Sequence, residues 1–144
     1  MKEDFNYDDV PNGYLHCLNA ECSRSADCLR YMLACHVRRQ TPSFSIVNPA
    51  FVAEQEECPY FRPDQFTRFA LGITHLFDNL SHPKAVKIRG VLRSHFGRSM
   101  FYRISDKQRL IKPEEQDFIR QAFIAEGIAE QPVFDQYIDR YSWL

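Results

Sequence analysis

The sequence predicts a mostly α protein, in which a Cys-bearing irregular and helical N-terminal segment packs on a C-terminal bundle of four to five helices. At most one short strand pair is expected. Apolar residues make up 44% of the 144 residues, which is enough for a packed core. Apolar side chains also recur at helical spacing between start and stop signals. The length suits one compact unit, which we divide into residues 1–62 and 63–144.

The N-terminal segment, residues 1–62, predicts one helix and little other regular structure. After a lead-in with a turn at residues 11–13, serine is the candidate cap of a helix from about residue 23 to residue 38. Residues 43–48 favour one short strand because they include β-branched and aromatic residues. Residues 54–57 predict an exposed acidic loop.

The C-terminal segment predicts a succession of helices. An apolar stripe at helical spacing predicts the first over residues 64–80, and residues 84–96 follow as a second that Gly97 ends. A short third helix is expected at 99–106. Proline, two glutamates and a following glycine then predict a helix that begins at Pro113 and ends just before Gly127. Residues 133–141 predict a last turn or two of aromatic-rich helix.

Charge is distributed unevenly along the chain. Residues 81–112 hold nine bases against one acid, a formal charge of +8, whereas the flanking residues 1–80 and 113–144 carry −4 and −5. Aromatic side chains are interleaved with these bases, a pattern that an anionic partner such as a nucleic acid requires. The alternative is that the acidic flanks neutralise this basic segment internally or that it forms a solvated face.

Compartment is predicted from what the sequence lacks. It shows no apolar run long enough for a membrane span and no secretory signal, so we expect a cytoplasmic protein that does not enter a membrane. In a reducing compartment, an odd number of five cysteines argues against a disulfide framework. The cysteines are then expected to bind metal, to pack or to react.

Four of the five cysteines surround turn-forming residues and are the candidate metal ligands: Cys17, Cys22, Cys28 and Cys58. Their spacing, with gaps of four and five residues before a distant fourth cysteine, matches neither paired zinc knuckles nor plant-type ferredoxins. Three interpretations stay open, namely a structural zinc ion, an iron–sulfur cluster, and reduced thiols without metal. Cys35 is expected in the core, and His16 is a further ligand candidate.

Catalysis has weaker support in the sequence. Cys28 near a helix start could have a lowered thiol pKa, but no nucleophile elbow accompanies it. No phosphate-binding glycine loop is present. We therefore assign no catalytic residue, and a cysteine-dependent enzyme is the third functional hypothesis.

Residues 86–104 resemble the core of a helix-turn-helix in small phage-repressor-like modules, since an amphipathic helix, a glycine and a short helix with Arg and Tyr follow in order. In those modules the helix after the turn lies in the DNA major groove. The resemblance implies contacts to DNA from five residues: Arg98, Ser99, Tyr102, Arg103 and Lys107. The sequence departs from that pattern around the turn, where the interval is about two residues shorter, and at Arg93, where a small residue usually packs.

Five motifs lie along nearly the whole chain, namely His16-Cys17 through Cys28-Leu29-Arg30, Asn48-Pro49, Cys58-Pro59-Tyr60-Phe61, Phe96-Gly97-Arg98 and Pro113-Glu114-Glu115-Gln116. By these motifs the chain is similar to a Bacteroidetes family, a domain of unknown function with a Cys-rich N-terminal half. The resemblance implies no activity and no cofactor.

Together these patterns predict a metal-stabilised binding protein, with DNA as one expected partner for a regulator or accessory factor. The alternative is a protein–protein interaction module with no role in nucleic-acid binding. Zinc is the expected metal, and an iron–sulfur cluster or no metal are the alternatives.

Overall fold

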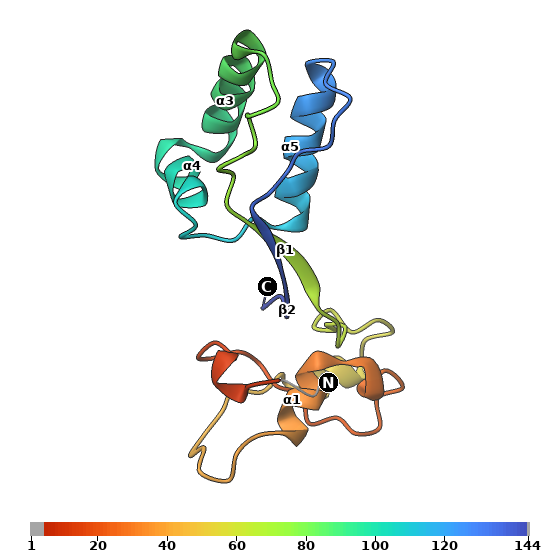
Figure 1. Ribbon diagram of the computed structural model, residues 1–144. Helices are drawn as coiled ribbons and strands as arrows, with labels where there is room; N and C mark the ends of the chain where they lie inside the picture. The colour runs from red at the N-terminus through yellow and green to blue at the C-terminus, as the bar shows by residue number, and fades with distance from the viewer. Residues whose placement is uncertain (1–4, 144) are drawn as a thin grey trace. The chain divides into compact units, whose positions relative to one another are not determined.

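A computed structural model of the chain describes residues 5–143, whose path is shown in Figure 1. Within that range the protein has five α-helices and one antiparallel pair of strands, which confirms the predicted fold class. The described residues form two compact units. Unit 1 consists of those up to Phe66 together with those from Tyr141 onward, and unit 2 is Thr67–Arg140.

Unit 1 contains two short helices, α1 (Leu29–Cys35) and α2 (Pro49–Ala53). The helix predicted over residues 23–38 is thus shorter than expected at both ends. It ends where the His36 N–H donates to the Leu33 carbonyl and the His36 ring nitrogen lies 2.7 Å from the Met32 carbonyl oxygen. These bonds satisfy carbonyls of the last turn and stop the helix.

The strand predicted at residues 43–48 is reduced to a single parallel bridge between Ile46 and His16. The segment that follows forms α2, which we did not predict although the sequence carries its signal. The Asn48 side chain accepts a hydrogen bond of 3.1 Å from the Ala50 N–H, and Pro49 occupies the first helical turn. Asparagine followed by proline is a typical helix start.

The core of unit 1 is small. Leu29 and Leu33 of α1 are buried against Tyr14 and Tyr141, and Trp143 packs against this cluster. Units of fewer than about 70–80 residues seldom reach useful stability from a core of this size alone, and they usually add disulfides or a structural metal. All five cysteines are free thiols.

Unit 2 contains three helices and both strands. The helices are α3 (His82–Phe96), α4 (Arg98–Ser105) and α5 (Pro113–Ala125), which confirm the three helices predicted between residues 84 and 127. Strand β1 (Thr67–Leu71) pairs antiparallel with β2 (Gln136–Arg140). Figure 1 shows α3 and α5 side by side, with α4 beyond the end of α3.

The two strands lie where we predicted helices, at residues 64–80 and 133–141, so both of those predictions are wrong. The C-terminal helices therefore number three in the described range rather than four or five. Phe69 and Ala70 are neighbours in β1, and both are buried. On the edge of β1 that does not face β2, Ala70 forms a bridge to Ile111. The pairing partner lies about seventy residues away, and a distant partner overrides local helical spacing.

The core of unit 2 is formed mainly by the three helices. Its buried side chains include Ile88 and Leu92 of α3, Ile104 of α4, and Ile119 and Phe123 of α5. Val86 of α3 is 51% exposed. The buried positions follow the three- and four-residue spacing of each helix.

Asp135 connects the loop after β1 to the loop after α4. Its carboxylate accepts hydrogen bonds from the Thr74 N–H and hydroxyl, at 3.0 and 2.6 Å, and pairs with Lys107 Nζ at 3.1 Å. Burial raises the pKa of this carboxyl, but the bonds from Thr74 and Lys107 outweigh burial and hold the pKa below its ordinary value. Gly72 lies directly beneath this carboxylate, with a φ of +80°.

Replacing Gly72 with alanine is expected to destabilise the protein by about 3 kcal/mol. The left-handed backbone costs an alanine roughly 1–2 kcal/mol, and overpacking adds about as much again. The new Cβ would overlap Asp135 Oδ2 and lie 2.8 Å from Lys107 Cε. Gly127→Ala is the matched control, because Gly127 has a φ of +70° and open space around it. Equal losses for both variants in urea unfolding would contradict the overlap at Asp135.

Candidate metal centre and basic surface

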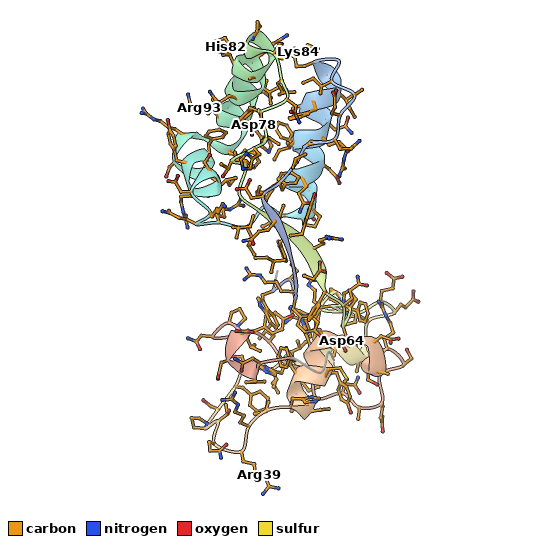
Figure 2. The ribbon with its side chains drawn as sticks, in the orientation of Figure 1. Arg39, Asp64, Asp78, His82, Lys84 and Arg93 are labelled. Carbon is orange, nitrogen blue, oxygen red and sulfur yellow. The ribbon has the colours of Figure 1, made fainter. Side chains whose placement is uncertain are left out.

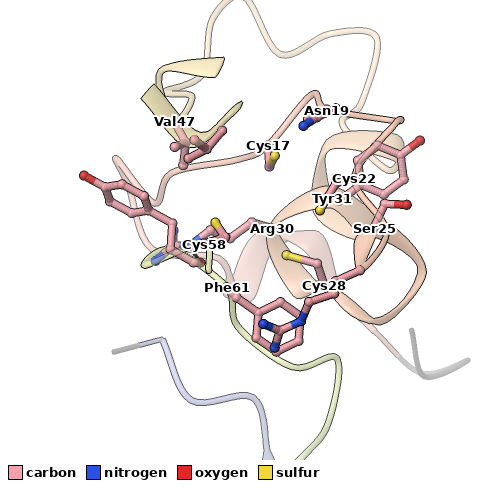
Figure 3. Close-up of a pocket in the computed structure, with 13 residues that line it drawn as sticks. Cys17, Asn19, Cys22, Ser25, Cys28, Arg30, Tyr31, Val47, Cys58 and Phe61 are labelled. Atoms are coloured by element: carbon pink, nitrogen blue, oxygen red, sulfur yellow. Dashed lines mark hydrogen bonds between the residues drawn. The ribbon is translucent and has the colours of Figure 1, made fainter. Parts of the chain in front are cut away.

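The four predicted ligands Cys17, Cys22, Cys28 and Cys58 line one cavity of about 30 Å³ in unit 1. Figure 3 shows their sulfur atoms facing a common space. The thiols come from three separate stretches of the chain. Cys28 is buried, and the other three are partly exposed.

Backbone hydrogen bonds hold the first three of these cysteines against α1. The Cys17 N–H donates to the Arg30 carbonyl at 3.0 Å. Ser25 links Cys22 to Cys28, because its N–H donates to the Cys22 carbonyl and its carbonyl accepts from the Cys28 N–H. Cys28 is itself the N-cap of α1. Three thiols are thus fixed around the first turn of one helix.

Cys58 approaches from the loop that precedes unit 2. Its carbonyl accepts a 3.2 Å bond from the Phe61 N–H, which closes a tight turn. The same loop is tied to α1, since the Leu29 N–H donates to the Arg62 carbonyl at 2.7 Å and Cys28 bridges to Pro63. These bonds bring a thiol thirty residues distant in sequence to the same cavity.

Two arginines also line the cavity. Arg30 is 7% exposed, and its guanidinium donates to two carbonyl oxygens, those of Tyr60 at 2.8 Å and Leu15 at 2.7 Å. Arg24 stacks on Phe61, with its guanidinium carbon 3.3 Å from the ring centroid. No described carboxylate pairs with either arginine.

The thiols surround the cavity without forming a coordination sphere. Across residues 5–143, no three His, Cys, Asp or Glu side chains make a group that could hold a metal ion as they stand. Metal binding would therefore require the sulfur atoms to move inward. Side-chain rotation about χ1 provides such movement without displacing the backbone.

His16 and Cys35 are not at this cavity. His16 is buried, with Nε2 at 2.6 Å from the Tyr7 hydroxyl and Nδ1 at 2.9 Å from the Tyr14 carbonyl oxygen, so both ring nitrogens are engaged elsewhere. Cys35 is exposed at the end of α1, and our expectation that it packs in the core is wrong.

Acidic residues from outside residues 81–112 neutralise part of the basic segment. Arg109 pairs with Glu115 through two bonds of 2.6 and 3.0 Å. Two lysines are paired as well, Lys87 with Glu126 at 2.9 Å and Lys107 with Asp135 at 3.1 Å. Since three outside carboxylates are engaged in this way, the formal charge of +8 falls to +5.

Four of the five candidate DNA contacts lie on the exposed side of α4: Arg98, Ser99, Tyr102 and Arg103. The fifth, Lys107, forms the ion pair with Asp135 described above. Arg93 of α3 joins this surface, because its guanidinium donates a 3.1 Å bond to the Tyr102 hydroxyl. Figure 2 shows Arg93 projecting outward from α3. We call Arg93, Arg98, Tyr102 and Arg103 the basic corner.

The connection between α3 and α4 is a single residue. Gly97, with φ of 77° and ψ of 154°, is at once the C-cap of α3 and the N-cap of α4. A helix-turn-helix motif uses a turn of three to four residues. The α3–α4 pair is therefore a tighter helical corner than the motif it resembles in sequence.

The chain belongs to a family of unknown function, DUF6078, whose model matches residues 1–143. No curated protein and no solved structure matches it. Among the helices within residues 5–143, none combines the length and the apolar character needed to cross a membrane.

Proposed function

We propose that this member of the DUF6078 family is a zinc-stabilised DNA-binding protein, in which thiolates hold unit 1 together and the basic corner of unit 2 contacts the phosphate backbone. The observation that carries the proposal is the gathering of four cysteines, from three stretches of chain, around one cavity. Thiolate ligands select soft metals over Mg²⁺ or Ca²⁺.

The size of the cavity favours a single ion over a cluster. A water needs roughly 10–15 Å³ of comparable volume, so about 30 Å³ accommodates one or two water-sized bodies. A cubane of four irons and four sulfides is much larger than this. Zinc held by four thiolates would carry a net charge of −2, and Arg24 and Arg30 at the cavity wall would balance it.

The role of zinc would be structural. Unit 1 has helices of only seven and five residues and a small aromatic and leucine core. Metal ligation would join Cys58 to the first turn of α1 and close a loop of about thirty residues. Four protein ligands would leave no open coordination position, which is typical of structural rather than catalytic zinc.

The basic corner supports the DNA-binding half of the proposal. Its three arginines form no ion pair with a described carboxylate, and Tyr102 is 42% exposed between them. Exposed arginines bind phosphate through two parallel hydrogen bonds. An aromatic side chain held among them can contact a sugar or a base edge.

Titration of the full chain with a random-sequence DNA duplex at several salt concentrations tests this function. Each phosphate contact should contribute about −0.9 to the slope of log K against log salt. Three arginines therefore predict a slope of about −2.7. No binding at low salt, or binding that salt does not weaken, would contradict the DNA-binding role and favour the protein-interaction alternative.

A further inference from the structure

A second cavity lies in unit 1 and shares no lining residue with the cysteine cavity. It is an open cleft of about 380 Å³ between residues 7–16 and 41–45. Small-molecule sites in proteins usually occupy about 300–1,000 Å³. The cleft is therefore large enough for a compact ligand.

Tyr7 and His16 form a fixed hydrogen-bonded pair at the cleft. His16 Nδ1 lies 2.9 Å and 3.3 Å from two carbonyl oxygens, of Tyr14 and Ser45, and carbonyls only accept. The ring proton is thus on Nδ1, and Nε2 accepts the Tyr7 hydroxyl proton across 2.6 Å. The Tyr7 oxygen is left with lone pairs only, so a ligand must donate a proton to it.

The remaining polar groups of the cleft are neutral. Thr41, Ser43 and Ser45 contribute hydroxyls, and Asn12 an amide, none of which has a side-chain hydrogen-bond partner in the described part of the chain. No Asp, Glu, Lys or Arg lines the cleft. A phosphate or carboxylate would find no counter-charge here, and burying an unpaired charge is costly.

Aromatic surface completes the cleft. Phe44 is 40% exposed, and its ring centroid lies 5.0 Å from that of His16. We infer that this cleft binds a neutral polyhydroxylated molecule such as a monosaccharide. Its hydroxyls donate to Tyr7 and exchange hydrogen bonds with the serine and threonine hydroxyls, and its apolar ring face packs on Phe44.

The cleft and the cysteine cavity are both lined by residues of one pair of extended segments. His16 exchanges two 2.8 Å backbone bonds with the other segment, donating to the Ser45 carbonyl and accepting from the Val47 N–H. His16 and Ser45 line the cleft, whereas Cys17 and Val47 line the cysteine cavity. For the neighbouring residues His16 and Cys17 this follows from the alternation of side chains along extended chain. The inference does not depend on metal or DNA binding.

Fluorescence of Trp143, the chain's single tryptophan, can report on the cleft, because its ring centroid lies 5.3 Å from that of Tyr14, which lines the cleft. The full chain is titrated from micromolar to millimolar concentration with glucose, galactose and N-acetylglucosamine, and in parallel with glucose 6-phosphate. At least one neutral sugar should give a saturable change, and the phosphate ester should bind at least about tenfold more weakly.

Two variants place the binding at the cleft. Tyr7→Phe and Ser43→Ala should each weaken the sugar that binds by about fivefold or more, as expected for one lost hydrogen bond. Tyr7→Phe also removes a hydrogen bond to His16 and could disturb folding. Ser43 is exposed, so Ser43→Ala tests the cleft without that complication. Tyr137→Phe, an exposed tyrosine of β2 in unit 2, is the control and should bind normally. The inference is overturned if no neutral sugar binds, if the phosphate ester binds equally well, or if Ser43→Ala binds as the control does.

Discussion

Cys28→Ser is expected to lose its zinc and to unfold unit 1, whereas Cys35→Ser is expected to keep both metal and fold. Loss of a side chain that only supports a metal ligand lowers metal affinity by up to roughly 100-fold. Loss of one of the four ligands themselves should therefore lower zinc affinity by at least that much. Structural zinc in small domains contributes folding free energy directly, so the unfolding transition of unit 1 should move with metal content. Metal analysis and thermal unfolding by circular dichroism measure the two effects.

Chelation separates loss of metal from loss of packing at Cys28, which is a buried side chain. A strong chelator should lower the melting temperature of the unmodified chain and of Cys35→Ser, which is exposed. The same chelator should leave Cys28→Ser unchanged. Equal zinc content in the two variants would show that Cys28 is not a ligand.

The second large effect is expected at the basic corner. Arg98→Ala combined with Arg103→Ala should weaken duplex binding and reduce the salt slope by about 1.8, because each phosphate contact contributes about 0.9. At moderate salt this corresponds to a loss on the order of tenfold or more. Fluorescence anisotropy of a labelled duplex at four or five salt concentrations gives both quantities.

A charge-matched control removes two arginines elsewhere, Arg39→Ala combined with Arg68→Ala. Both side chains are exposed, and neither lies on α3 or α4. The control has the same net charge as the test variant, so it separates local contact from overall charge. If the two double variants lose the same affinity and the same slope, the basic corner is not the DNA-binding surface.

Local signals explain the part of the fold that was predictable. Pro113 at a helix start and Gly97 and Gly127 just past helix ends bracket segments whose apolar spacing is helical, and α3, α4 and α5 form there. At β1 and β2 the local sequence pattern predicts helices instead. Their stability comes from a pairing across about seventy residues, and no window of sequence contains both partners.

For the candidate sites, too, residue types are visible in the sequence, whereas contacts between distant segments are visible only in the folded chain. The sequence identified the four cysteines by residue type, but only the folded chain brings Cys58 to α1. It could not show that Lys107 is neutralised by Asp135, because that ion pair depends on where two loops distant in sequence meet. In the sequence Arg93 departs from the helix-turn-helix pattern, yet its bond to Tyr102 places it in the basic corner.

The most direct test of the central claim is the metal content and absorption spectrum of protein purified without oxygen. We predict about one zinc ion per chain and no absorption in the visible range, as for a closed four-thiolate site. Iron together with a brown colour would show that the four cysteines hold an iron–sulfur cluster and not zinc. Protein that folds with no bound metal, and that takes up none when zinc is added under reducing conditions, would contradict the account.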